Sequence, residues 1–129
     1  MSTLQKILYV EDEADIQTVA KLALEMLGGF TVKICSSGQQ ALSEAQAFAP
    51  DMVLLDVMMP GMDGPTTLQE LRKLPDLAQV PVAFMTAKVQ PAEVAHFKSL
   101  GAVEVIAKPF DPMTLAQQVR AVWESARAG

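Results

Sequence analysis

The chain has 129 residues, of which 50% are hydrophobic and 19% are charged, so it has the length of one domain and the composition of a folded one. Its formal net charge of −5 disfavours direct binding to nucleic acid, whose phosphate backbone usually meets basic surfaces. The chain shows no apolar run of the roughly 20 residues that a membrane helix needs, no secretory signal after Met1 and one cysteine, Cys35. We therefore expect a cytoplasmic protein without a disulfide that binds neither nucleic acid nor membranes.

Short apolar runs alternate with amphipathic segments along the whole chain. The first run, Ile7–Val10, stops abruptly at an acidic triplet, and the third, Met52–Leu55, runs straight into Asp56. Continuous apolar runs of this length are typical of buried strands. The predicted strands are 7–10, 30–35, 52–55, 80–85 and 103–107.

Each predicted strand is followed by a predicted helix. The first helix is expected to end at Gly28 and Gly29, which suit the left-handed turn after a helix. Apolar residues recur in it at helical spacing: Ile16, Val19, Ala20, Ala23, Leu24 and Leu27. Ser36 or Ser37 is expected to cap the second helix, which Pro50 ends.

The later helices have similar boundary signals. The third helix ends before Pro75, and the fourth begins at Pro91 and ends at Gly101. Asp111 is the candidate cap of the last helix. The apolar face of that helix is expected to contain Leu115, Val119, Val122 and Trp123.

The alternation of strand and helix predicts one α/β domain over residues 1–129, with no linker and no second, output domain. Apolar strands that alternate with helices imply a parallel sheet that is covered on both faces. Right-handed crossovers then favour a doubly wound topology. In such sheets, ligands bind outside the carboxyl ends of the strands.

Chemically active residues follow four of the five predicted strands. Since the carboxyl ends of parallel strands share one edge of a sheet, these side chains are expected to meet there. They are Glu11, Asp12, Asp56, Thr86, Ala87 and Lys108. Clustered carboxylates repel one another unless a pKa rises or a cation binds. Oxygen ligands without histidine or cysteine favour Mg²⁺, and the added lysine and hydroxyl are typical parts of a phosphoryl-transfer site.

Four stretches of sequence carry a resemblance to a known family. They are Tyr9–Asp12, Leu54–Gly64, Thr86–Ala87 and Lys108–Phe110. In this order and spacing, the whole chain resembles a receiver domain of two-component response regulators and is similar to the single-domain chemotaxis regulator. The resemblance implies the flavodoxin-like (βα)5 fold, with a five-stranded parallel sheet in the order 2-1-3-4-5. It also implies a phosphorylatable signalling switch of a phosphorelay rather than an enzyme.

The resemblance assigns the metal site to the acidic residues. Asp12 and Asp56 would bind Mg²⁺ directly, together with the backbone carbonyl of Met58. Glu11, which replaces an aspartate common in the family, would act through a water on the ion. Asp56 would also be the phosphoacceptor.

The remaining residues would bind the phosphoryl group. Lys108 would pair with one phosphoryl oxygen, while the Thr86 hydroxyl and the Ala87 backbone N–H would bind the others. The resemblance also implies a cis peptide bond between Lys108 and Pro109. Chemotaxis-type receivers carry an aromatic residue three positions before the lysine, where this chain has Val105. Val105 cannot turn a large ring between exposed and buried positions, so a threonine–aromatic switch is not expected.

The family also implies the partners. The phosphoryl donor would be a histidine kinase or a phosphotransfer protein. The signal would pass to a downstream effector protein or to an output domain that this sequence lacks. A homodimer is suggested by family analogy alone.

Three other functions fit the sequence less well. An aspartate-nucleophile phosphatase would carry a second acid two residues after Asp56, where this chain has Met58. A flavin-mononucleotide-binding protein would need a phosphate-binding loop after the first strand, where acidic residues repel phosphate. A pseudo-receiver that only docks partners would not need the complete set of Asp12, Asp56, Thr86 and Lys108.

Overall fold

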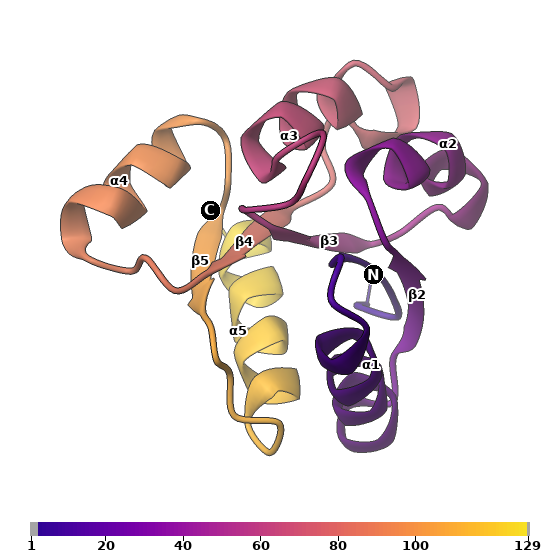
Figure 1. Ribbon diagram of the computed structural model, residues 1–129. Helices are drawn as coiled ribbons and strands as arrows, with labels where there is room; N and C mark the ends of the chain where they lie inside the picture. Colours follow the sequence, from indigo (N-terminus) through magenta and orange to yellow (C-terminus); the bar gives the residue numbers. More distant parts are fainter. Residues whose placement is uncertain (1–2, 129) are drawn as a thin grey trace.

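A computed structural model describes residues 3–128, which form a five-stranded parallel sheet with the strand order β2-β1-β3-β4-β5 (Figure 1). The strands are β1 (Lys6–Val10), β2 (Thr31–Cys35), β3 (Met52–Asp56), β4 (Val82–Thr86) and β5 (Glu104–Ala107). The predicted fold class and strand order are therefore confirmed. Met1, Ser2 and Gly129, which the sequence prediction includes in the domain, lie outside the described residues.

Helices cover both faces of this sheet, as the apolar strands require. They are α1 (Ala14–Gly28), α2 (Gly38–Phe48), α3 (Gly64–Arg72), α4 (Pro91–Ser99) and α5 (Leu115–Ala128). In Figure 1, α1 and α5 lie below the sheet, and α2, α3 and α4 lie above it. A short 3₁₀ helix, η1 (Pro75–Leu77), which the sequence analysis did not predict, follows α3.

Two hydrophobic cores lie on the two faces of the sheet. The lower core, between the sheet and helices α1 and α5, contains Tyr9, Leu24 and Trp123. The upper core, between the sheet and helices α2, α3 and α4, contains Phe84 and Cys35. Alternate residues of β1 face opposite cores, because successive side chains of a strand point to opposite sides. Ile7 and Tyr9 therefore point to the lower core, and Leu8 and Val10 point to the upper core.

Most predicted helix boundaries are confirmed. Gly29 ends α1 with a φ of 71°, in the left-handed region that glycine tolerates. The Ser37 hydroxyl caps α2 by accepting from the backbone N–H of Gln40 at 3.1 Å. At α3, the Asp63 carboxylate does the same for Thr66 at 2.9 Å.

Two details of the helices differ from the simplest interpretation of the sequence. Val19 and Leu27, which recur at helical spacing in α1, are 43% and 53% exposed. Val19 lies at the margin of the face that α1 turns to the sheet. Leu27 lies in the last turn of a helix of about 22 Å, which is longer than the roughly 16 Å strands beneath it. Asp111 precedes α5 by four residues, and its carboxylate accepts from the backbone N–H of Met113 at 2.9 Å. It therefore caps the turn before the helix.

Candidate functional site

The site forms where neighbouring strands end. β1 pairs with β3, with Val10 opposite Leu55, so the residues after β1 lie beside the last residue of β3, Asp56. β4 pairs with the other side of β3 and places Met85 opposite Asp56. The chain that leaves β5 passes the end of β4, where the backbone N–H of Lys108 donates to the backbone carbonyl of Thr86 at 2.9 Å. Four segments thus meet at one edge of the sheet.

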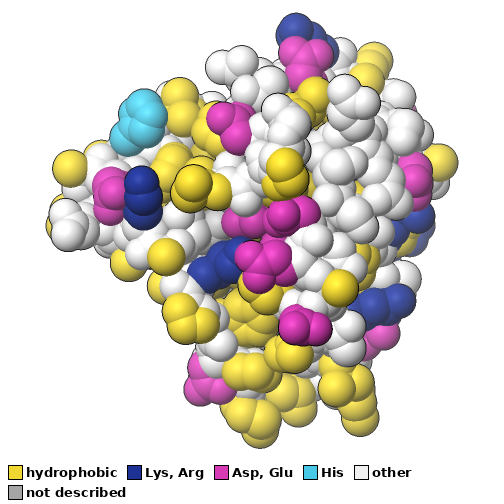
Figure 2. Space-filling view, viewed as in Figure 1, with side chains coloured by type: hydrophobic (Ala, Val, Ile, Leu, Met, Phe, Trp, Pro, Cys, Tyr) yellow, Lys and Arg dark blue, Asp and Glu magenta, His cyan; other side chains and the backbone are white. Residues whose placement is uncertain are grey.

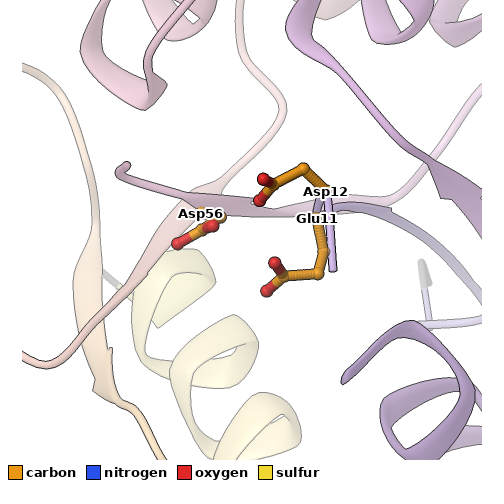
Figure 3. Close-up of side chains that lie close together, drawn as sticks. All are labelled: Glu11, Asp12 and Asp56. Atoms are coloured by element: carbon orange, nitrogen blue, oxygen red, sulfur yellow. The ribbon is translucent and has the colours of Figure 1, made fainter. Parts of the chain in front are cut away.

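Three carboxylates converge at this edge. Figure 3 shows Glu11 and Asp12, which follow β1, and Asp56 at the end of β3, with their carboxylates directed into a common space. One oxygen from each lies within 4.8 Å of the others. Glu11 is completely buried and Asp56 is 4% exposed, whereas Asp12 is open to solvent. The predicted meeting of these three residues is confirmed.

Lys108 joins two of the carboxylates. Its Nζ lies 2.9 Å from Oε1 of Glu11 and 3.2 Å from Oδ1 of Asp56, and the lysine side chain is 16% exposed. The peptide bond between Lys108 and Pro109 is cis, as the resemblance implied. In the space-filling view, acidic side chains gather at the centre of the visible face with a basic side chain beside them (Figure 2).

Burial and charge shift the pKa values of this cluster. Burial, followed by the negative charge of Glu11, raises the pKa of Asp56 from 3.8 to about 6, although Lys108 opposes the shift. For Lys108, burial acts to lower the pKa, but the ion pairs with Glu11 and Asp56 outweigh it and hold the pKa above its ordinary value. The Lys108 amine therefore stays protonated at neutral pH, beside the carboxylates of Glu11 and Asp56.

The other predicted site residues lie around this cluster. Thr86 is buried at the end of β4, and its Oγ1 accepts from the backbone N–H of Lys88 at 3.1 Å. Because Oγ1 acts as an acceptor there, the hydroxyl proton is available for another partner. Ala87 is exposed at the same edge, and the side chain of Met58 is 70% exposed.

Residues that the sequence analysis did not place in the site hold Glu11 in position. The Gln17 side-chain amide donates to the Glu11 carbonyl and to the Ser36 hydroxyl, which ties the β1–α1 junction to the segment after β2. The Tyr9 hydroxyl lies 3.4 Å from Oε1 of Glu11. The signal for Tyr9 was a single tyrosine in an otherwise aliphatic strand, two residues before Glu11.

Comparisons with known proteins agree with this geometry. A sequence profile of the response regulator receiver domain matches residues 7–120. The probable transcriptional regulator ycf27 of Guillardia theta is 39% identical over 122 residues, which cover 95% of this chain and 46% of that protein. The transcriptional regulatory protein CseB of Streptomyces coelicolor is 37% identical over 116 residues, which cover 90% of this chain and 48% of that protein.

A solved structure shows the same fold. The chemotaxis protein CheY4 of Vibrio cholerae superposes with a TM-score of 0.85 at 28% identity, covering 93% of this chain and 99% of CheY4. The chain belongs to the response regulator receiver domain family. Receiver domains are signalling domains of two-component systems. This chain spans about half the length of the curated relatives it matches. Within residues 3–128, no helix has both the length and the apolar character to cross a bilayer.

Proposed function

We propose that this chain is a phosphorylatable switch in which Asp56 accepts a phosphoryl group from a phosphohistidine of a histidine kinase or a phosphotransfer protein. One observation carries the proposal. Asp56 is a nearly buried carboxylate at the rim of the sheet, 3.2 Å from the Lys108 amine and within 4.8 Å of two further carboxylates. A cation and an acidic cluster around a buried acid are the parts that phosphoryl transfer needs.

The transfer exchanges one bond to phosphorus for another. An oxygen of ionised Asp56 forms a bond to phosphorus while the bond from phosphorus to the imidazole nitrogen of the donor breaks. The electron pair of that bond stays on the imidazole nitrogen, and the product is an acyl phosphate on Asp56. A loose transition state demands little nucleophilicity, so positioning and charge neutralisation dominate the catalysis. Lys108 supplies a fixed positive charge beside the reacting carboxylate.

The acidic cluster fits Mg²⁺. Glu11, Asp12 and Asp56 offer only oxygen atoms, and hard divalent cations prefer such ligands. These residues and the backbone carbonyl of Met58 are the ones that would hold the ion. Bound Mg²⁺ would neutralise the negative charge of the carboxylates and of the phosphoryl oxygens.

Phosphorylation would change the charge that Lys108 and Thr86 meet. A phosphoryl group adds about −1.5 to −2 charge at neutral pH. Lys108 would exchange its ion pairs for a phosphoryl oxygen, and the available proton of the Thr86 hydroxyl would bind a second one, with the Ala87 N–H at a third. Both residues stand at the starts of the segments after β4 and β5, so the event shifts the population of conformers of those segments. Val105 in β5, at the position three residues before Lys108, is partly buried and has no aromatic ring to rotate.

An apolar surface beside Lys108 suits the phosphoryl donor. A cavity of about 240 Å³ is lined by Asp15, Ile16, Val19, Lys108, Pro109 and Phe110. Figure 2 shows hydrophobic side chains over the lower part of the molecule, at α1 and the segment before α5. A donor whose histidine reaches Asp56 must cover this rim. We assign the cavity to an apolar surface of that donor.

We propose further that residues 1–129 form the whole receiver domain and that it works in the cytoplasm. Phosphorylation would alter its contacts with an effector protein or with an output domain outside this sequence. The curated relatives support the second arrangement, because each is about twice as long as the stretch it shares with this chain.

Intact mass spectrometry after incubation with acetyl phosphate and Mg²⁺ tests the proposal. We expect one added phosphoryl group that is stable in acid and lost in base, as an acyl phosphate is. Asp56→Ala should abolish it, whereas Asp76→Ala, which removes an exposed aspartate from η1, should not. Equal labelling of the Asp56→Ala variant contradicts the assignment of the acceptor, and an unlabelled wild type contradicts the proposed function.

A further inference from the structure

Tyr9 carries a buried hydroxyl that the proposed reaction does not use. The residue is completely buried in β1, and its ring packs in the lower core. The hydroxyl lies 3.4 Å from Oε1 of Glu11, to which it donates. Burial, and then the negative charges of Glu11 and Asp56, raise the pKa of Tyr9 above its ordinary value, so the hydroxyl keeps its proton. A buried hydroxyl is costly without a partner, so Tyr9 and Glu11 stabilise each other.

Glu11 is held by three donors. Oε1 accepts from Lys108 at 2.9 Å and from Tyr9 at 3.4 Å, and Oε2 accepts from the backbone N–H of Glu13 at 3.1 Å. The shortest of these contacts comes from Lys108, which also pairs with Asp56. When Lys108 moves to a phosphoryl oxygen, Oε1 of a completely buried carboxylate loses its closest donor. Tyr9 is then the donor that remains at that oxygen.

We propose that Tyr9 is a positioning residue, whose hydroxyl keeps the Glu11 carboxylate oriented towards the acidic cluster while Lys108 exchanges partners. The inference rests on the proposed function, because it concerns Glu11 as a residue that would hold Mg²⁺. The long contact of 3.4 Å fits an oxygen that is shared with Lys108. It should shorten once the lysine leaves. A phenylalanine would fill the same space in the core, so the hydroxyl serves Glu11 rather than packing.

Tyrosine NMR tests the exchange without metal or phosphoryl donor. Tyr9 is the only tyrosine of the chain, so a sample labelled with ¹³C at the ring carbon that bears the hydroxyl gives one signal. Lys108→Met removes the competing donor, and we expect the signal to move downfield as the hydroxyl donates more strongly to Glu11. Lys88→Met, which removes an exposed lysine, is the matched control and should leave the signal in place. An unmoved signal in Lys108→Met overturns the inference.

Binding of Mg²⁺ tests the consequence for the site. We expect Tyr9→Phe to raise the Kd for Mg²⁺, followed by NMR of the Asp12 amide, about three- to tenfold, as the loss of one ordinary hydrogen bond would. Thr67→Val is the control, because it removes a buried hydroxyl that donates to the Asp63 carbonyl at 2.8 Å, outside the acidic cluster. It should leave the Kd unchanged.

The outcomes separate the two proposals. A wild-type chain that binds no Mg²⁺ overturns the proposed metal site and the inference with it. A wild-type chain that binds Mg²⁺ with the same Kd as Tyr9→Phe overturns the positioning role alone. A Kd that rises equally in Tyr9→Phe and Thr67→Val also overturns it, because the effect would then follow the loss of any buried hydrogen bond.

Discussion

Asp56 occupies an environment that favours its neutral form. It is 4% exposed, and burial together with the charge of Glu11 raises its pKa to about 6. The ion pair with Lys108 at 3.2 Å offsets part of this cost but does not cancel it. A carboxylate that is ionised at neutral pH in such a place destabilises the fold, and this strain is what a cation or a phosphoryl group would relieve.

Replacing Asp56 with asparagine should therefore stabilise the metal-free protein. A shift from 3.8 to about 6 means that the folded state binds more protons than the unfolded state between these pH values, so wild-type stability falls as pH rises through this range. At about pH 7, Asp56→Asn should raise the free energy of unfolding by about 1–3 kcal/mol, at 1.36 kcal/mol per pKa unit. The gain should shrink towards zero near pH 4, where wild-type Asp56 is protonated.

Urea denaturation in EDTA at the two pH values measures this effect. Asp76→Asn, which neutralises an exposed aspartate, is the control for net charge and should change stability by less than about 0.5 kcal/mol. A gain in Asp56→Asn that is as large at pH 4 as at pH 7 would show that the charge of Asp56 is not its source.

The loop between β3 and α3 fixes where Asp56 stands. Gly64 at the start of α3 donates its N–H to the Val57 carbonyl at 2.8 Å, which folds the loop back onto the end of β3. A Cβ at Gly64 would lie 2.6 Å from the Asp56 carbonyl oxygen and 2.8 Å from Cα of Val57. Both are backbone atoms, which cannot swing aside as a side chain can. Gly64 thus permits the close approach that holds the end of β3 in place.

We expect Gly64→Ala to move the end of β3 and to slow phosphorylation. The clash should cost about 1–3 kcal/mol of stability, as overpacking does. Gly61→Ala is the matched control in the same loop, because its Cβ meets nothing within 4 Å and only its φ of 81° is strained. Denaturation curves and a time course of acetyl phosphate labelling, taken where both variants are folded, compare them. Equal labelling rates would show that Gly64 supports the fold but not the site.

The elements that the sequence predicted best are those with local causes. Apolar runs located the central strands β1, β3 and β4, because burial on both faces leaves little room for polar residues. The edge strands β2 and β5 are partly exposed and contain Lys33 and Glu104. The edge where Glu11, Asp56 and Lys108 meet followed from the rule that parallel strands end together. These features depend on residue type and chain order alone.

The features that sequence analysis missed depend on contacts between distant segments. No local sequence pattern predicts the η1 helix. The Arg72 side chain stabilises the turn that follows this helix by donating to the carbonyls of Leu77 and Val80. The shorter ion pair of Lys108, to Glu11, spans 97 positions of the chain. The Tyr9 hydroxyl is placed by the pleat of β1 and by the turn that returns the Glu11 side chain to the core. Contacts of this kind, between segments far apart in the sequence, become visible only in the three-dimensional structure.

At the scale of the whole molecule, the doubly wound arrangement leaves one edge of the sheet for chemistry. Helices occupy both faces, so a phosphoryl donor would have to reach Asp56 from the rim between α1 and the segment after β5 (Figure 1). Val19 in α1 is 43% exposed and lines the cavity beside Lys108. Val89, after β4, is also 43% exposed but lines a separate cavity against β5 and α5. Because Val19 and Val89 are equally exposed but line different cavities, substitutions at the two positions can be compared directly.

Val19→Gln should slow phosphoryl transfer from a protein donor but not from acetyl phosphate. A small donor needs only the acidic cluster and Lys108, whereas a protein donor must also bury the surface around Val19. Loss of one buried valine contact costs about 1.5 kcal/mol, or about tenfold in rate. Transfer from the phosphorylated cytoplasmic part of a histidine kinase that labels the wild-type chain, followed by intact mass, measures this. Val89→Gln should transfer at the wild-type rate. If the two variants slow equally, or if acetyl phosphate labelling falls with kinase labelling in Val19→Gln, the donor does not dock on α1.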